Sequence, residues 1–195
     1  ILFSLAVHEA LDRAQAELQP GEHIFAFLDD VYALCAPERV REVYNCLERH
    51  LTSVAGIWLH QGKTRVWNRA GLRHPNLEDL GRDVWSPEGI KVLGTPVGNA
   101  AYVRGLLSER LEEERKLWES IPFVCDPQCA WQLVIQCAVP MANHVLRTVP
   151  PSLVGDYAQV HDDGVWLAAS QAVGGLPGDL GKKLVQNVAS LPLQL

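Results

Sequence analysis

The sequence lacks the features of several protein classes. It has no internal repeat and no long low-complexity linker, and 48% hydrophobic with 21% charged residues is the composition of a globular protein, which excludes a disordered or collagenous chain. It has no excess of basic residues, because 17 Lys and Arg against 23 Asp and Glu give a net charge of −6. A surface that tracks nucleic acid phosphates over its whole area is therefore excluded. The length of 195 residues allows one ordinary domain or two small ones.

The cysteines and histidines lack the spacing of a disulfide framework or a zinc site. Five cysteines are an odd number, they are scattered, and no secretory n-region accompanies them, which favours an intracellular, reducing compartment, either nucleus or cytoplasm. Cys125 and Cys129 do not form a CxxC pair, and no His-x₃-His or His/Cys pair stands out, so we do not expect zinc. We expect the cysteines, and most of the six tryptophans, to be core or incidental residues.

The longest stretch without Asp, Glu, Lys or Arg covers residues 127–146. It approaches the length of a membrane span, but its glutamines and the central Pro140 favour a buried helix that is broken near the proline, and we expect no membrane partner. Residues 1–11 already have the pattern of a helix in progress. We therefore expect an upstream part of the same polypeptide.

Hydrophobic periodicity predicts an α/β (α+β) first half and an all-helical second half. The composition changes near Gly98, and we expect a domain boundary there, between residues 1–98 and 99–195. In the first half the expected elements are helices over 1–18 and 37–54, a hairpin of 23–28 and 31–35, a strand pair of 56–60 and 64–67, a polar loop over 68–88 and a strand over 90–93. In the second half we expect helices over 103–118, 127–146 and 152–172, and a weaker one from Pro177 onward.

Two adjacent aspartates, Asp29 and Asp30, lie at the tip of the predicted hairpin. Neighbouring carboxylates raise each other's pKa, and a divalent cation removes that cost. Mg²⁺ binds one or two carboxylates together with substrate phosphates, so the pair is suited to one half of a phosphoryl-transfer site. The alternative is that both aspartates are ordinary turn formers.

The order of these segments resembles reverse transcriptases of the non-LTR retrotransposon type. Residues 27–30, FLDD, resemble the family's F/Y-x-D-D box; residues 62–66, GKTRV, are similar to the SKT or GKT segment after the palm helix; and residues 91–98, KVLGTPVG, resemble the YLGxxLG primer grip segment. Residues 1–6 look like the end of the helix before the box, and residues 137–151 are similar to the thumb. The likeness covers nearly the whole chain, more specifically over 1–98, but without the fingers and the earlier palm strand that carries the first metal-binding aspartate.

The resemblance implies a partial palm with an antiparallel hairpin sheet, a thumb-like helical segment, and nucleotidyl transfer with two Mg²⁺ ions. Asp29 would be the more direct metal ligand and Asp30 a supporting carboxylate, while Lys63 would be a cation near the triphosphate and perform acid catalysis toward pyrophosphate. Leu93 and Gly94 would lie at the primer grip, and Phe27 would contact nucleic acid beside the aspartates. A solvated lysine and a plain strand end are the alternatives for Lys63 and for the Leu93-Gly94 turn.

The implied partners are an RNA template, a DNA primer and deoxynucleoside triphosphates. A local basic stretch, which contains no acidic residue, could meet template or primer phosphates, although a solvated loop would have the same composition; it consists of Lys63, Arg65, Arg69 and Arg73. We expect the chain alone to be inactive because it offers only the hairpin carboxylates. A non-catalytic retroelement remnant or domesticated module that binds RNA or protein is the main alternative, and a hydrolytic nuclease is another.

Overall fold

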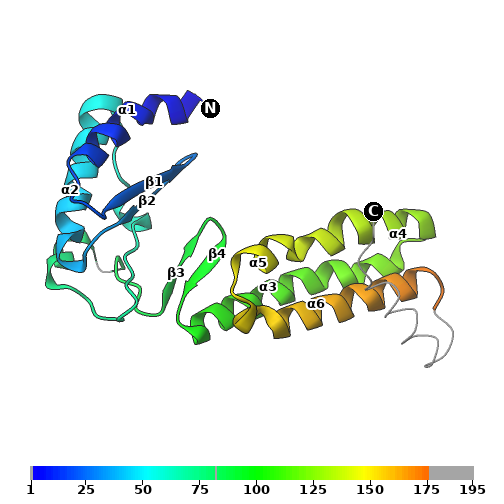
Figure 1. Cartoon of the computed structure of the whole chain (residues 1–195). Coiled ribbons are helices and arrows are strands. Elements are labelled where there is room, and N and C mark those ends of the chain that lie inside the picture. Colours follow the sequence, from blue (N-terminus) through cyan, green and yellow to red (C-terminus); the bar gives the residue numbers. More distant parts are fainter. Residues whose placement is uncertain (1, 82, 176–195) are drawn as a thin grey trace. The chain divides into compact units, whose positions relative to one another are not determined.

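The computed structural model describes residues 2–81 and 83–175. It is an α+β structure of helices and two small antiparallel sheets, and it divides into two compact units, residues 1–99 and 100–195 (Figure 1). We refer to them as the N-terminal unit and the helical unit. The division falls at Asn99, next to the boundary that the change in composition predicts.

Two helices form the core of the N-terminal unit. α1 (Leu2–Ala16) packs against α2 (Val40–His50), which follows a 3₁₀ turn, η1 (Pro37–Arg39), and continues as a π-helical turn, η2 (Leu51–Ala55). The apolar residues spaced three and four apart in the sequence are the buried ones: Val7, Ala10, Ala14, Val43, Leu47 and Leu51. Gly56 ends the helix with φ 65°, the left-handed conformation that glycine adopts without strain. Both predicted helices are confirmed.

The predicted hairpin is also present. β1 (His23–Phe27) and β2 (Asp30–Leu34) pair antiparallel, with Phe27 opposite Asp30. Leu28 and Asp29 form the turn, in which Leu28 has the unusual φ of 55°. Because side chains alternate along a strand, Ile24 and Val31 pack onto the helices while the opposite face stays exposed.

The predicted strand pair of 56–60 and 64–67 is wrong. Residues Gln61–Lys63 form a 3₁₀ turn, η3, closed by the N–H of Lys63 on the carbonyl of His60 (2.9 Å). Val66 bonds instead to the segment beyond it, since its N–H donates to Val84 (2.6 Å) and its carbonyl accepts from Ser86 (3.0 Å). The Val66 backbone groups therefore form one isolated parallel bridge with Trp85.

The predicted polar loop of 68–88 contains a part of the core. A 3₁₀ segment, η4 (Pro75–Leu80), and the residues after it bury Leu77, Leu80 and Val84 against Tyr44 of α2. A second hairpin follows, β3 (Gly89–Val92) and β4 (Thr95–Gly98), of which the sequence indicated only the first strand. Its turn residues Leu93 and Gly94 have φ of 49° and 81°, as tight hairpin turns require.

Over its described residues, 100–175, the helical unit consists of two long helices and one irregular run. α3 (Ala100–Ser120) packs along α6 (Pro151–Ala172), and between them lie η5 (Ile121–Phe123), α4 (Pro127–Leu133), η6 (Val134–Ala138), η7 (Val139–Ala142) and α5 (Asn143–Thr148). The predicted break near Pro140 is confirmed, because the run passes there from π-helical to 3₁₀ geometry. The predicted helix from Pro177 lies outside the described residues. Among the residues described, no helix is both long and apolar enough to cross a membrane.

Glu114 of α3 is a buried carboxylate with three donors around it. Its Oε1 accepts from Arg110 Nε (2.8 Å) and from the Tyr157 hydroxyl (2.7 Å), and its Oε2 lies 2.9 Å from Nδ1 of His161. Burial raises the pKa of Glu114, but the hydrogen bonds from His161, Tyr157 and Arg110 outweigh it and hold that pKa below its ordinary value. Glu114 thereby joins α3 to α6 through polar contacts inside an apolar core.

Because the folded-state pKa of Glu114 is lowered, its contribution to stability is present above the unfolded-state pKa, near about 4.3, and is lost as the pH falls through the folded-state value. We expect Glu114→Gln to lower the free energy of unfolding by about 1–3 kcal/mol at pH 7, because an amide replaces an acceptor of three bonds. The difference from wild type should shrink toward pH 3. Urea unfolding at both pH values measures it, with the exposed neighbour Glu113→Gln as the control; an equal Glu114→Gln deficit at both values would contradict the account.

Gly164 of α6 makes room for Trp118 of α3. A Cβ at position 164 would lie 2.3 Å from Cε3 of the Trp118 ring, which is less than any real contact. The ring is itself buried and meets His161 edge-on at 5.3 Å between centroids. Glycine at this position is therefore a packing requirement of the α3–α6 contact.

We expect Gly164→Ala to destabilise the helical unit by about 1–3 kcal/mol through overpacking. Gly155→Ala is the matched control, because it lies in the same helix with open space around its Cβ and should stabilise by up to about 1 kcal/mol. Thermal unfolding of both variants measures the difference. Equal effects of the two substitutions would show that Trp118 moves aside freely.

Candidate functional site

The candidate site lies at the closed end of the β1–β2 hairpin. Asp29 is a turn residue and Asp30 is the first residue of β2, and both are exposed to solvent. The sequence placed both aspartates at the tip, and the structure places one in the turn and the other beside it. A cation and a ligand from solvent can therefore reach both carboxylates.

Tyr32 joins this hairpin to the β3–β4 turn. Its hydroxyl donates to Oδ2 of Asp30 (3.2 Å) and accepts from the backbone N–H of Leu93 (3.2 Å). Asp30 and Tyr32 are two residues apart on one strand, so their side chains lie on the same face of the sheet. The Leu93-Gly94 turn, 61 residues beyond Tyr32, is thereby bonded beside the aspartates.

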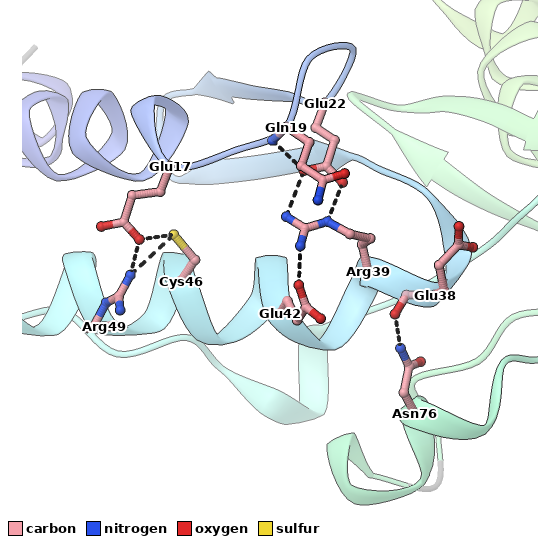
Figure 2. A network of polar contacts seen from close by, with 9 residues as sticks. All are labelled: Glu17, Gln19, Glu22, Glu38, Arg39, Glu42, Cys46, Arg49 and Asn76. Atoms are coloured by element: carbon pink, nitrogen blue, oxygen red, sulfur yellow. Dashed lines mark hydrogen bonds and ion pairs between the residues drawn. The ribbon is translucent and has the colours of Figure 1, made fainter.

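A buried carboxylate holds the start of the hairpin. Glu22 accepts from Arg39 Nε on Oε1 (3.0 Å), and on Oε2 from Arg39 Nη2 (3.1 Å) and the backbone N–H of Gln19 (2.9 Å) (Figure 2). The bonds from Arg39 and Gln19 hold the pKa of Glu22 below its ordinary value. Gln15 of α1 also bonds here, since its side chain donates to the Glu22 carbonyl (3.1 Å) and accepts from the Ile24 N–H (2.7 Å).

Figure 2 also shows how the following segments are fixed to this frame. Arg39 pairs with Glu42 on α2 as well as with Glu22, and Nδ2 of Asn76 donates to the carbonyl of Glu38 (2.7 Å). The η4 segment is therefore bonded to the start of the same helix that Arg39 joins to Glu22. One network of polar contacts thus connects the segment before β1, the start of α2 and η4.

The remaining predicted site residues are Phe27, the Leu93-Gly94 turn and Lys63. Phe27 is exposed at the end of β1, and Leu93 and Gly94 form the turn described above. Lys63 is an exposed residue of η3 and not of a strand, and within the described residues no hydrogen bond or ion pair joins it to Asp29 or Asp30. The predicted strand pair of 56–60 and 64–67, which would have placed Lys63 in a hairpin turn, does not form, so Lys63 lies in neither of the two described sheets.

The predicted basic stretch is exposed throughout: Lys63, Arg65, Arg69 and Arg73. Arg65 bends back to its own turn, where Nη1 donates to the carbonyls of Gly62 (2.9 Å) and Thr64 (2.8 Å). The other three side chains leave positive charge at the surface of the N-terminal unit. Phosphates could approach this stretch from solvent.

The structure also brings together residues that the sequence analysis missed. Glu17, Cys46 and His50 each direct one potential ligand atom to a common point, with these atoms within 4.8 Å of one another. The signal was the Cys-x₃-His spacing on α2, which puts both side chains on one helix face. All five cysteines are free thiols and none is buried, so of the two readings, core or incidental, the incidental one fits them. Of the six tryptophans only Trp118 is buried, while three are half-buried and two are exposed, so the expectation that most tryptophans are core residues is wrong.

No family model, curated protein or solved structure matches this chain.

We expect Tyr32→Phe to free the Leu93 amide, because the phenyl ring keeps the packing and loses the hydroxyl that bonds to both Asp30 and this turn. Loss of these exposed bonds should cost about 0.5–1.5 kcal/mol and speed hydrogen exchange at Leu93. Amide exchange by NMR measures it, with the Ile90 amide in the β3–β4 ladder as the internal reference. Unchanged exchange at Leu93 would show that the Tyr32 bond does not hold the turn.

Proposed function

We propose that this chain is a palm and thumb-like part of a reverse transcriptase of the non-LTR retrotransposon type, an RNA-directed DNA polymerase. The observation that carries the proposal is the Tyr32 hydroxyl, which bonds to both Asp30 and the Leu93 amide. The two sequence segments that resemble the catalytic box and the primer grip are thereby adjacent, although they are far apart in the chain. A polymerase requires that adjacency, because the primer end must lie against the metal-binding carboxylates.

Asp29 and Asp30 would hold the metal in this proposal. Their exposed carboxylates are the hard oxygen ligands that Mg²⁺ prefers. The two Mg²⁺ ions, when bound, would neutralise charge on the attacking primer hydroxyl and on the departing pyrophosphate. Asp29, exposed at the turn, would be the more direct ligand, while Tyr32 orients Asp30 through its hydroxyl.

The turn of Leu93 and Gly94 would support the primer strand. Positive φ at both residues presents a tight backbone turn with no β-carbon at Gly94, so nucleic acid can approach the backbone closely. Phe27, exposed next to the aspartates, offers a ring face for stacking on a base or sugar. Lys63, exposed in η3, would act as a cation toward the triphosphate only when substrate bridges it to the hairpin.

The charge distribution supports nucleic acid binding by a limited surface. A chain of −6 repels phosphates on average, whereas the stretch from Lys63 to Arg73 attracts them within a Debye length of about 8–10 Å. The helical unit would correspond to the thumb. Binding through few phosphate contacts is weak and depends on salt with a shallow slope.

A non-catalytic module that binds RNA or protein is the second candidate. The observation that favours it is the exposed apolar hairpin face, where Phe25, Phe27 and Leu34 are each more than half exposed. Such a face suits a binding surface whether or not the aspartates hold metal. Metal dependence of nucleic acid binding separates the two candidates.

We expect the chain to bind an RNA–DNA primer-template duplex weakly, with Mg²⁺ strengthening binding and added salt weakening it. A triple variant should bind all nucleic acid sequences about equally more weakly; its substitutions are Arg65→Ala, Arg69→Ala and Arg73→Ala. The reason is that contacts to phosphates orient a protein on the nucleic acid but do not distinguish base sequences. Fluorescence anisotropy at two salt concentrations measures the change in affinity.

We expect no primer extension by the chain alone when deoxynucleoside triphosphates are present, since two carboxylates from one hairpin leave a two-metal site without a third protein ligand.

The matched control replaces Arg13, Arg115 and Lys116 by Ala, which changes net charge equally at exposed positions of α1 and α3 that are not part of the basic stretch. It should lose much less affinity than the first triple variant. Equal losses would show that only net charge matters, and binding that ignores both Mg²⁺ and Asp29→Asn would favour the non-catalytic module. Extension by the chain alone would overturn the expected inactivity.

A further inference from the structure

A cluster of three different metal-ligating side chains lies where α1 ends beside α2. His50 Nε2 is 2.8 Å from Oε1 of Glu17, and Cys46 Sγ is 3.6 Å from Oε2 of the same carboxylate. The three potential ligand atoms lie within 4.8 Å of one another. Glu17 immediately follows α1, whereas Cys46 and His50 both belong to α2.

The fold holds these side chains in place independently of any ion. Cys46 and His50 are one helical turn apart on the same face, which is the spacing at which two ligands can share a metal. Ala14 of α1 packs on Val43 and Leu47 beside them, and the Cys46 thiol also donates to the Ala14 carbonyl (3.8 Å). The His50 side chain is only 14% exposed, so its ring is constrained by packing.

The donor set and its spacing suit zinc. Thiolate sulfur, imidazole nitrogen and carboxylate oxygen are the three ligand types that Zn²⁺ takes in proteins. A tetrahedral zinc with the usual bond lengths separates sulfur from oxygen by about 3.6 Å and nitrogen from oxygen by about 3.3 Å. Cys46 Sγ lies 3.6 Å from Oε2 of Glu17, which fits this spacing, whereas His50 Nε2 contacts the other oxygen, Oε1, at 2.8 Å. One Glu17 oxygen can therefore serve the same ion as both neighbours once the half-exposed carboxylate turns.

We propose that Glu17, Cys46 and His50 form a zinc site that ties the end of α1 to α2, with a water molecule as the fourth ligand. The thiol of Cys46 gives up its proton to solvent when the zinc–sulfur bond forms. Arg49 is the competitor, because its guanidinium pairs with Glu17 and lies 3.7 Å from Cys46 Sγ (Figure 2). The Arg49 side chain is 59% exposed, so it can turn into solvent when the cation replaces it.

Zinc titration of the whole chain tests the proposal, with Co²⁺ as the spectroscopic probe. Cobalt should bind one to one with a thiolate-to-metal absorption band and with the strong visible absorption of four-coordinate geometry, and zinc should displace it. Cys46→Ser should abolish the thiolate band, and His50→Gln should weaken affinity by at least about 10- to 100-fold. Zinc at a hundredfold excess over its Kd should raise Tm by about 10 °C, reversed by a chelator.

Arg49→Gln is the informative variant, because it removes the competing guanidinium and leaves all three ligands. The proposal expects tighter metal binding in Arg49→Gln, whereas a cluster that exists only as an ion pair would show loss of stability and no metal binding. A variant with Ser at the exposed Cys125, Cys129 and Cys137 should bind as wild type does. Asp29→Asn with Asp30→Asn should also leave zinc binding intact, which separates this site from the proposed Mg²⁺ site.

Loss of the thiolate band in the triple serine variant, or its persistence in Cys46→Ser, would assign the metal to other cysteines and overturn the proposal. Absence of any cobalt band in both wild type and Arg49→Gln would also overturn it. Circular dichroism of Cys46→Ser and His50→Gln checks that both fold. If either does not fold, Glu17→Gln, which alters an exposed ligand, gives the same discrimination.

Discussion

The placement of the candidate site depends on the ion pair between Glu22 and Arg39. Glu22 is 6% exposed and lies in the segment that leads from α1 into β1, while Arg39 lies at the start of α2. A two-pronged guanidinium–carboxylate contact fixes direction as well as distance, and the Gln19 N–H satisfies the carboxylate further. Loss of Arg39 would leave the buried Glu22 carboxylate without its counter-charge. The hairpin therefore leaves the helices in one orientation, which sets where Asp29 and Asp30 lie.

Hydrogen bonds then connect the hairpin to the rest of the candidate site. β2 carries Asp30 and Tyr32 on one face, and the Tyr32 hydroxyl receives the Leu93 amide. A buried carboxylate has a similar role in the helical unit, where Glu114 accepts hydrogen bonds from its own helix and from α6. In both units a buried carboxylate joins elements that are distant in sequence, and apolar packing around it supplies the low-dielectric surroundings in which such bonds are strong.

The sequence predicted the elements whose evidence is local. The α1 and α2 helices follow from apolar spacing, and the first hairpin follows from two β-prone runs around Asp29-Asp30. The sequence analysis missed β4 because Pro96 and Gly98 both have low strand propensity, although β4 pairs with β3 in the structure. It also paired residues 64–67 with the neighbouring segment 56–60, whereas Val66 forms its bridge with Trp85. Glu17 lies 29 and 33 positions from Cys46 and His50, and Tyr32 lies 61 positions from Leu93, so hydrophobic periodicity cannot indicate these contacts.

The most direct test of the account is where a divalent cation binds the N-terminal unit. Mn²⁺ can replace Mg²⁺ at oxygen sites and broadens NMR signals of nearby amides. We expect selective broadening at Asp29, Asp30 and Tyr32 and also at Leu93 and Gly94, because the Tyr32 bond holds that turn beside the carboxylates. Asp29→Asn with Asp30→Asn should remove it. Broadening at the hairpin without the Leu93-Gly94 turn, or spread evenly over exposed acidic residues, would contradict the central claim.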